Sequence, residues 1–192
     1  MALPKKRTES CAAASGATLL DQLMPVFEFG HCHTIIVEAA VRMVAAGIEA
    51  YRLDQSFLVR LLFRLRGLGP APGTLRGSLI NRGFTLLAEE SGREVVVGIA
   101  GRFWALNERA NLVATPDAAA FVAFDRPGFA KAAMSIRFDA LVDGGTRLGT
   151  ETRVRCTDAG ARRRFALYWA VVGPFSAWIR QDLLRAIAAR AV

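Results

Sequence analysis

The chain has 192 residues, of which 53% are hydrophobic and 22% are charged. This length and composition are typical of one globular domain with its own core, and they exclude an intrinsically disordered protein. The net charge of +8 would permit contact with polyanions, but the basic residues are spread along the chain without interleaved aromatic residues or a nucleic-acid motif. We therefore expect no nucleic acid as a partner.

Residues 1–22 are interpreted as a flexible leader, because a basic Lys5–Arg7 cluster is followed by mostly small residues. The stretch that could serve as the apolar core of a signal peptide contains Ser15 and Gly16, and Asp21 follows soon after. These residues argue against a secretory signal.

The cysteines and the apolar stretches indicate a cytoplasmic protein. Cys11, Cys32 and Cys156 have no CxxC spacing and are odd in number, which favours buried or idle thiols in a reducing compartment. The longest uncharged stretch, from Phe165 to Ile179, is shorter than the roughly 20 residues that a bilayer requires.

Residues 23–192 are predicted to form a single domain. Its first element is a strand from about Val26 to Val37, and an alanine-rich helix follows from Glu38 to Tyr51. A second helix begins at Asp54, a suitable N-cap. It ends at Gly67–Gly73, where glycines and prolines cannot continue a helix.

The next part of the chain is predicted to be mostly sheet. Phe84–Glu89 and Glu94–Ile99 flank a Glu90–Arg93 turn and form a hairpin. Ala119–Phe124 is predicted to be another short strand. A last hairpin pairs Ala133–Val142 with Arg147–Cys156.

The last hairpin alternates between an apolar or small face and a charged face, which is typical of a sheet with one solvated side. The charged face carries Arg137, Asp139, Glu151, Arg153 and Arg155. We expect these side chains to form cross-strand pairs in solvent.

The chain closes with a helix between Arg162 and Arg190. Its large apolar residues recur at steps of three and four and so share one stripe: Phe165, Tyr168, Trp169, Val172, Phe175, Ile179, Leu183 and Ile187. Gly173-Pro174 should kink or break this helix. The kink would either enlarge a pocket against the sheet or let the helix follow the curvature of the sheet.

The order of one strand, two short helices, several antiparallel strands and a long helix indicates an α+β fold with its helices on one face. It resembles the helix-grip fold of the START/polyketide-cyclase (SRPBCC) superfamily in its bacterial members. The likeness covers about Val26 to the C-terminus and includes these stretches: LVRLLFRLRGL at 58–68, GIAGRFW at 98–104, PGF at 127–129, TETRVRC at 150–156, and 168–180. The Rieske branch is excluded because its Cys/His ligand pairs are missing.

The resemblance implies a curved antiparallel sheet wrapped around the long C-terminal helix, with an apolar cavity between them. The predicted ligand-binding side chains are Phe84, Leu86, Val97, Phe103, Met134, Ile136, Phe138, Phe165, Trp169, Val172 and Ile179. The alternative is that the same side chains interlock as a dry core. Arg102, beside Trp104, is the candidate for holding a carboxylate head group.

His31 and His33, two residues apart on the first predicted strand, share one face of it. A zinc site would need a third ligand, and the sequence offers none at a spacing characteristic of zinc sites. We therefore expect neither a metal nor another cofactor. His33 is the candidate catalytic residue if the protein transfers protons.

These features predict a protein, monomer or homodimer, that binds a hydrophobic small molecule such as a lipid or polyketide-like compound. One alternative is an enzyme of the polyketide cyclase/dehydratase type, in which a titratable side chain would point into the cavity. A second alternative is a ligand-free protein-interaction module. The basic residues of the second helix and the leader, with Arg76 and Arg82, would allow transient contact with an anionic membrane.

Overall fold

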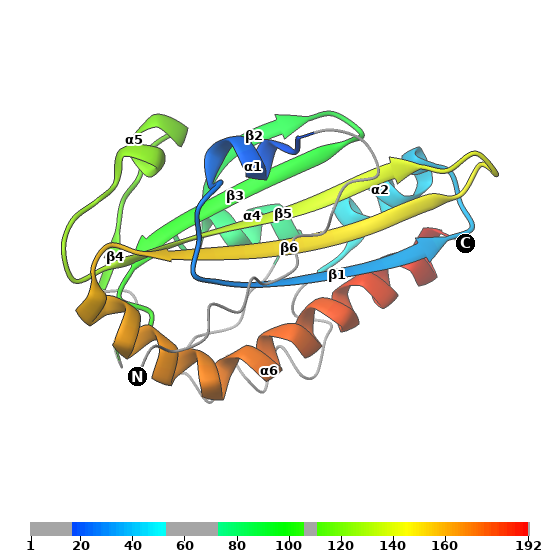
Figure 1. The fold of residues 1–192 in the computed structure, drawn as a ribbon. Coiled ribbons are helices and arrows are strands. Elements are labelled where there is room, and N and C mark those ends of the chain that lie inside the picture. Colours follow the sequence, from blue (N-terminus) through cyan, green and yellow to red (C-terminus); the bar gives the residue numbers. More distant parts are fainter. Residues whose placement is uncertain (1–16, 53–72, 106–110, 192) are drawn as a thin grey trace.

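The computed structural model describes residues 17–52, 73–105 and 111–191. Its strands form one open six-stranded sheet in the order β1-β6-β5-β3-β2, with β4 paired to β3 (Figure 1). The strands are β1 (Phe29–Val37), β2 (Thr85–Glu90), β3 (Glu94–Gly101), β4 (Leu112–Val113), β5 (Ala130–Ala140) and β6 (Thr146–Cys156). The helices are α1 (Leu19–Leu23), α2 (Val41–Ala50), α4 (Leu75–Ile80), α5 (Ala118–Ala123) and α6 (Ala159–Ala191).

All pairings in the sheet are antiparallel, and the first strand, β1, pairs with the last, β6. Both predicted hairpins are present, as β2–β3 and β5–β6. The long C-terminal helix packs against the sheet. The α+β prediction is therefore confirmed, with an arrangement consistent with a helix grip.

The sheet carries helices on both faces. We call the face that packs against α2 and α6 the inner face, and the face that packs against α1 and α5 the outer face (Figure 1). Alternation along β5 places Ile136 in the inner core and Ala133 in the outer core. The prediction that all helices lie on one face was wrong, because α1 and α5 cover part of the other.

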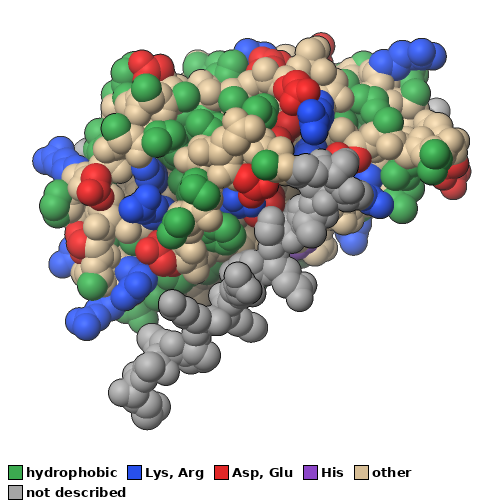
Figure 2. All heavy atoms as spheres, turned by 45° about the horizontal axis from the view of Figure 1, so that its top comes forward, with side chains coloured by type: hydrophobic (Ala, Val, Ile, Leu, Met, Phe, Trp, Pro, Cys, Tyr) green, Lys and Arg blue, Asp and Glu red, His purple; other side chains and the backbone are tan. Residues whose placement is uncertain are grey.

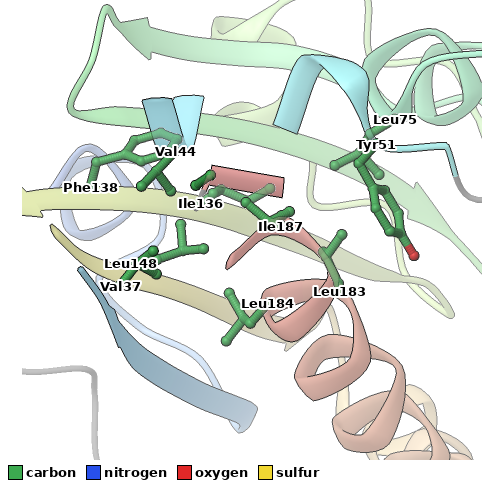
Figure 3. Close-up of a cluster of buried hydrophobic side chains, with 11 residues drawn as sticks. Val37, Val44, Tyr51, Leu75, Ile136, Phe138, Leu148, Leu183, Leu184 and Ile187 are labelled. Carbon is green, nitrogen blue, oxygen red and sulfur yellow. The ribbon is translucent and has the colours of Figure 1, made fainter. Parts of the chain in front are cut away.

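The inner core gathers mostly aliphatic side chains, chiefly from the sheet, α2 and α6, together with Tyr51 and Phe138 (Figure 3). Gly47 in α2 lies where the two helices approach each other, since a Cβ on it would come within 3.2 Å of the Ile187 backbone oxygen. The structure shows that a small residue there permits the close packing of α2 on α6.

α6 is one continuous helix of 33 residues with Pro174 inside it. It does not break at Gly173-Pro174, and Figure 1 shows it bowed along the sheet. Phe165, Leu183 and Ile187 are buried as the predicted stripe requires. Phe175 is 43% exposed, so its place on that stripe was wrong.

The short strand predicted at 119–124 is instead helix α5. The Asp117 side chain accepts a hydrogen bond from the Ala120 amide at 2.7 Å and so caps the helix. Phe121 then turns into the outer core, where Gly98 leaves room for its ring. The alternating pattern there was too short to distinguish a strand from one turn of a buried helix.

Other elements near β3 and α4 also differ from the sequence prediction or add to it. The strand β3 ends at Gly101, and 102–104 do not extend it. The helix α4, which the sequence did not predict, is capped by the Thr74 side chain, which accepts from the Gly77 amide. The helix predicted from Asp54 lies outside the described residues.

The helix α1 covers the outer face with residues that were assigned to the flexible leader. Thr18 and Asp21 form a capping box at its start. The Glu94 carboxylate of β3 accepts hydrogen bonds from the Leu19 amide at 2.7 Å and the Leu20 amide at 3.4 Å. The ordered chain thus starts before residue 22, while residues 1–16 lie outside the described part.

This covering helix buries charges that were expected in solvent. Arg153 is only 1% exposed, and its guanidinium donates to Glu151 at 2.7 Å, to Asp21 at 2.6 Å and to the Met24 carbonyl at 3.0 Å. Arg137, paired with Asp139 at 3.0 Å, is buried as well. Among the five predicted surface charges, Arg155 is exposed. Figure 2, with the top of Figure 1 turned forward, shows the charges mixed with hydrophobic side chains.

Candidate functional site

α6 runs alongside β1 on the inner face, and contacts between the two fix their register. The ring centroids of Phe29 and Phe165 are 4.9 Å apart, and those of His31 and Trp169 are 5.1 Å apart and stacked. Farther along, Val37 packs with Leu184 in the inner core. The interface therefore begins in an aromatic cluster and ends in an aliphatic one.

Between these two apolar clusters lies a group of polar side chains: His31, His33, Thr152 and Arg180, here called the polar cluster. His31 and His33 come from β1, and Thr152 stands opposite His31 on β6. Gly173 brings α6 against this part of the sheet, since a Cβ there would lie 3.4 Å from the His31 Nε2 atom. Arg180 follows two helical turns later.

The polar cluster contains three buried polar atoms without a hydrogen-bond partner: His33 Nε2, Thr152 Oγ1 and Arg180 Nε. The Arg180 Nη1 atom donates to the carbonyl and the hydroxyl of Ser176, one turn back. No described carboxylate forms an ion pair with Arg180. Such atoms cost about 1–3 kcal/mol each when they are left unsatisfied, so this concentration marks the site.

Burial and charge determine the protonation of the polar cluster. Burial lowers the pKa of Arg180 to about 10, so this guanidinium is charged at pH 7. Burial first, and then the positive charge of Arg180, lower the pKa values of His31 and His33 below 6.5. Both imidazoles are therefore mostly neutral at pH 7, and the cluster carries one positive charge.

The histidines make stability depend on pH. The unfolded chain binds their protons more readily than the folded protein, so stability is lost as the pH falls below about 6.5 toward the folded pKa values. We expect His33→Gln to reduce the decrease in the free energy of unfolding between about pH 7 and pH 5. Urea titrations at several pH values measure this, and an unchanged pH dependence would contradict it.

The structure divides the predicted ligand-binding residues among three places. Ile136 and Phe138 belong to the inner core, and Ile179 packs against it. Phe165, with Phe103 and Trp169 beside it, forms the aromatic cluster. Leu86, Val97 and Met134 stand side by side in register on three adjacent strands. Phe84 directly precedes β2, and Val172 is a half-buried residue of α6.

Arg102 does not join the other predicted site residues. Its Nε atom donates to the Gly128 carbonyl at 3.2 Å, and its guanidinium lies 4.4 Å from the centre of the Phe129 ring, in an exposed position. The cation at the sheet–helix interface is Arg180, a half-buried residue whose Nε atom is buried, and the sequence analysis did not single it out. The available signal was its position seven residues after Gly173 and seven before Ile187, on the buried stripe of α6.

Other candidate sites have less support. Among the described residues, no group of three or more His, Cys, Asp or Glu side chains could hold a metal ion. A cavity of about 10 Å³ on the outer face, lined by Arg137 and Glu151 among others, is large enough for only about one water molecule. None of the described helices combines the length and apolarity needed to cross a bilayer.

Of the two described cysteines, Cys32 departs from the prediction of buried or idle thiols and Cys156 agrees with it. Cys32 on β1 is disulfide-bonded. Cys156 is free and buried. A disulfide does not fit the reducing compartment that the cysteine spacing suggested.

The Cys156 thiol should be unreactive in the folded protein. Burial, together with the Glu28 carboxylate, raises its pKa to about 12, so almost no thiolate exists at pH 8. We expect iodoacetamide to label Cys156 only after unfolding in guanidinium, as measured by peptide mass spectrometry. Rapid labelling of the native protein would contradict the burial of this residue.

Comparisons with known proteins do not assign a family to this chain. No protein-family model matches it, and searches of curated proteins and of solved structures found no match. The polar cluster and the surfaces around it are therefore the basis for a functional proposal.

Proposed function

We propose that the protein binds a hydrophobic small molecule, lipid or polyketide-like, between the inner face of the sheet and α6. The polar cluster supports this proposal, because it leaves three buried polar atoms without partners in the middle of an otherwise apolar interface. A ligand-free core normally satisfies such atoms. Half-buried Met134, Trp169 and Val172 offer apolar contacts there.

The order of elements further supports membership of the START/polyketide-cyclase superfamily, which we keep as part of the proposal. The first strand pairs with the last, and the C-terminal helix lies along the inner face. The cytoplasmic location also stays a proposal. The disulfide at Cys32 counts against it, since disulfides are rare in reducing compartments.

Native mass spectrometry of gently purified protein, followed by solvent extraction of whatever dissociates, tests the binding function. We expect a stoichiometric apolar adduct, which Trp169→Ala removes because the Trp169 ring lies against His31 at the interface. Trp178→Ala is the matched control, since Trp178 lies on the same helix but is 54% exposed. An adduct-free mass that persists after incubation with lipid extracts would overturn the proposal.

Enzymatic proton transfer is the second candidate function, and His33 is the observation that favours it. Its imidazole is mostly neutral at pH 7, and the buried Nε2 atom has no partner, so it could accept a proton from a bound substrate. Under this alternative, His33→Ala abolishes turnover of a polyketide-like substrate while ligand binding persists.

A protein-interaction role is favoured by exposed apolar side chains on the solvent side of α6: Leu167, Val171, Phe175 and Trp178. Such a module would dimerise or capture a partner independently of added lipids. Membrane contact has less support, because Arg76 is paired with Glu89 at 3.1 Å. The basic residues of 5–7 and 60–66 lie outside the described part.

A further inference from the structure

We infer that the ligand carries a carboxylate head group, which Arg180 binds with the help of His33 and Thr152 inside the sheet–helix interface. This inference rests on the proposed binding function and specifies the chemical class of the ligand. The residue that binds the head group is then Arg180 on α6, and not Arg102.

Among the described residues, the fully buried cations differ from the half-buried Arg180. Arg153 has carboxylate partners at 2.6 and 2.7 Å, and Arg137 has one at 3.0 Å. The Lys131 ammonium donates to the Phe121 and Val122 carbonyls at the end of α5. Arg180 has only Ser176 among the described residues. A buried cation needs compensation, and a ligand anion would supply it.

The geometry of the polar cluster suits an anion between the sheet and the helix. Ser176 holds the Arg180 guanidinium by one nitrogen and leaves the Nε–H free to donate. The Thr152 hydroxyl of the sheet can donate as well, and so can His33 Nε2 in the neutral tautomer that carries its proton there; both atoms are unused. Unused donors thus come from both sides of the interface, the helix and the sheet.

The charge of the cluster favours a carboxylate over a phosphate. The low pKa values of His31 and His33 leave both imidazoles mostly neutral, so Arg180 contributes the single positive charge of this cluster at pH 7. A monoanion neutralises that charge, whereas a phosphate monoester would leave excess negative charge in a buried place. The planar guanidinium also matches a carboxylate in shape.

The sheet provides an apolar path that leads away from the polar cluster. Register places a row of inner-face side chains side by side across the strands: His31, Thr152, Met134, Val97 and Leu86. The row is polar at His31 and Thr152 and apolar from Met134 onward, and three strand spacings, or about 14 Å, separate Thr152 from Leu86. A chain of that length could lie along it with its carboxylate at the Arg180 end.

Isothermal titration of dodecanoate and dodecanol, both below their aggregation concentrations, tests the inference because the two probes share one tail. We expect the wild-type protein to bind dodecanoate about tenfold or more tightly than dodecanol. Arg180→Gln should bring the two affinities within about twofold and leave dodecanol binding unchanged. Arg185→Gln, an exposed change on the same helix, should keep the wild-type preference.

Each other outcome contradicts a different claim. Equal binding of both probes to the wild type would overturn the carboxylate inference and leave the binding function standing. Binding of neither probe would overturn both. A preference that survives in Arg180→Gln would place the head group elsewhere, and tighter binding of dodecyl phosphate than of dodecanoate would replace the carboxylate with a phosphate.

Discussion

Replacing Arg153 with alanine is expected to lower the free energy of unfolding by about 3–5 kcal/mol. Arg153 is buried between β6 and α1, where it neutralises Glu151 and Asp21 and donates to the Met24 carbonyl. The substitution would leave the Glu151 carboxylate buried without its cation, and α1 would lose its main polar contact with β6. Urea denaturation followed by circular dichroism measures the change.

The neighbouring arginine provides the matched control for this prediction. Arg155 lies two residues farther along β6 and is exposed, so Arg155→Ala should change stability by no more than about 0.5 kcal/mol. Similar losses for both variants would mean that α1 does not cover the outer face in solution. Susceptibility of the chain near Leu19–Leu23 to limited proteolysis in Arg153→Ala would support the detachment of α1.

Replacing Arg180 with methionine is expected to raise the free energy of unfolding by about 1–3 kcal/mol. Burial lowers the pKa of Arg180 to about 10, well below the ordinary value of a guanidinium. Each pKa unit corresponds to about 1.4 kcal/mol, and solvent screening reduces the cost because Arg180 is only half-buried. Below about pH 10 Arg180 is charged in both states, and burying this charge makes the folded state less stable relative to the unfolded one. Methionine keeps much of the apolar stem without the charge.

The difference in stability between Arg180→Met and the wild type should depend on pH above about pH 10. From about pH 10 upward, until the ordinary pKa of a guanidinium is reached, the unfolded chain binds more protons than the folded protein at this site, so the contribution of Arg180 to stability rises with pH. The advantage of Arg180→Met over the wild type should therefore shrink through that range. Urea titrations of both proteins at about pH 8 and pH 11 measure it, and lower stability of Arg180→Met at pH 8 would give Arg180 a structural role instead.

Measuring both the stability of Arg180→Met and its affinities for dodecanoate and dodecanol distinguishes a role of Arg180 in folding from a role in ligand binding. A variant that is more stable than the wild type but has lost its preference for dodecanoate would show that the wild-type charge is kept at a cost to folding. Binding residues often carry such a cost, because a ligand supplies the compensation that the protein lacks.

Local patterns in the sequence were sufficient for the elements and their main pairing. Alternation around the Glu90–Arg93 turn predicted the β2–β3 hairpin, and the step of three and four predicted α6. Both signals are local, since they depend on which side of one element each residue faces. The sequence predicted a strand where α5 forms, because the helical conformation there depends on the Asp117 cap and on the space that Gly98 leaves for Phe121.

The sequence by itself determined the α+β architecture, the two hairpins and the apolar stripe of the closing helix, because periodicity is a property of neighbouring residues. Only the tertiary structure decided which charges are buried. Arg153 and Arg155 lie two residues apart on the same face of β6 and look alike in sequence, yet α1 covers only Arg153. Arg180 likewise becomes a candidate binding residue only where α6 lies beside β1, since burial without a counter-charge depends on elements far apart in the chain.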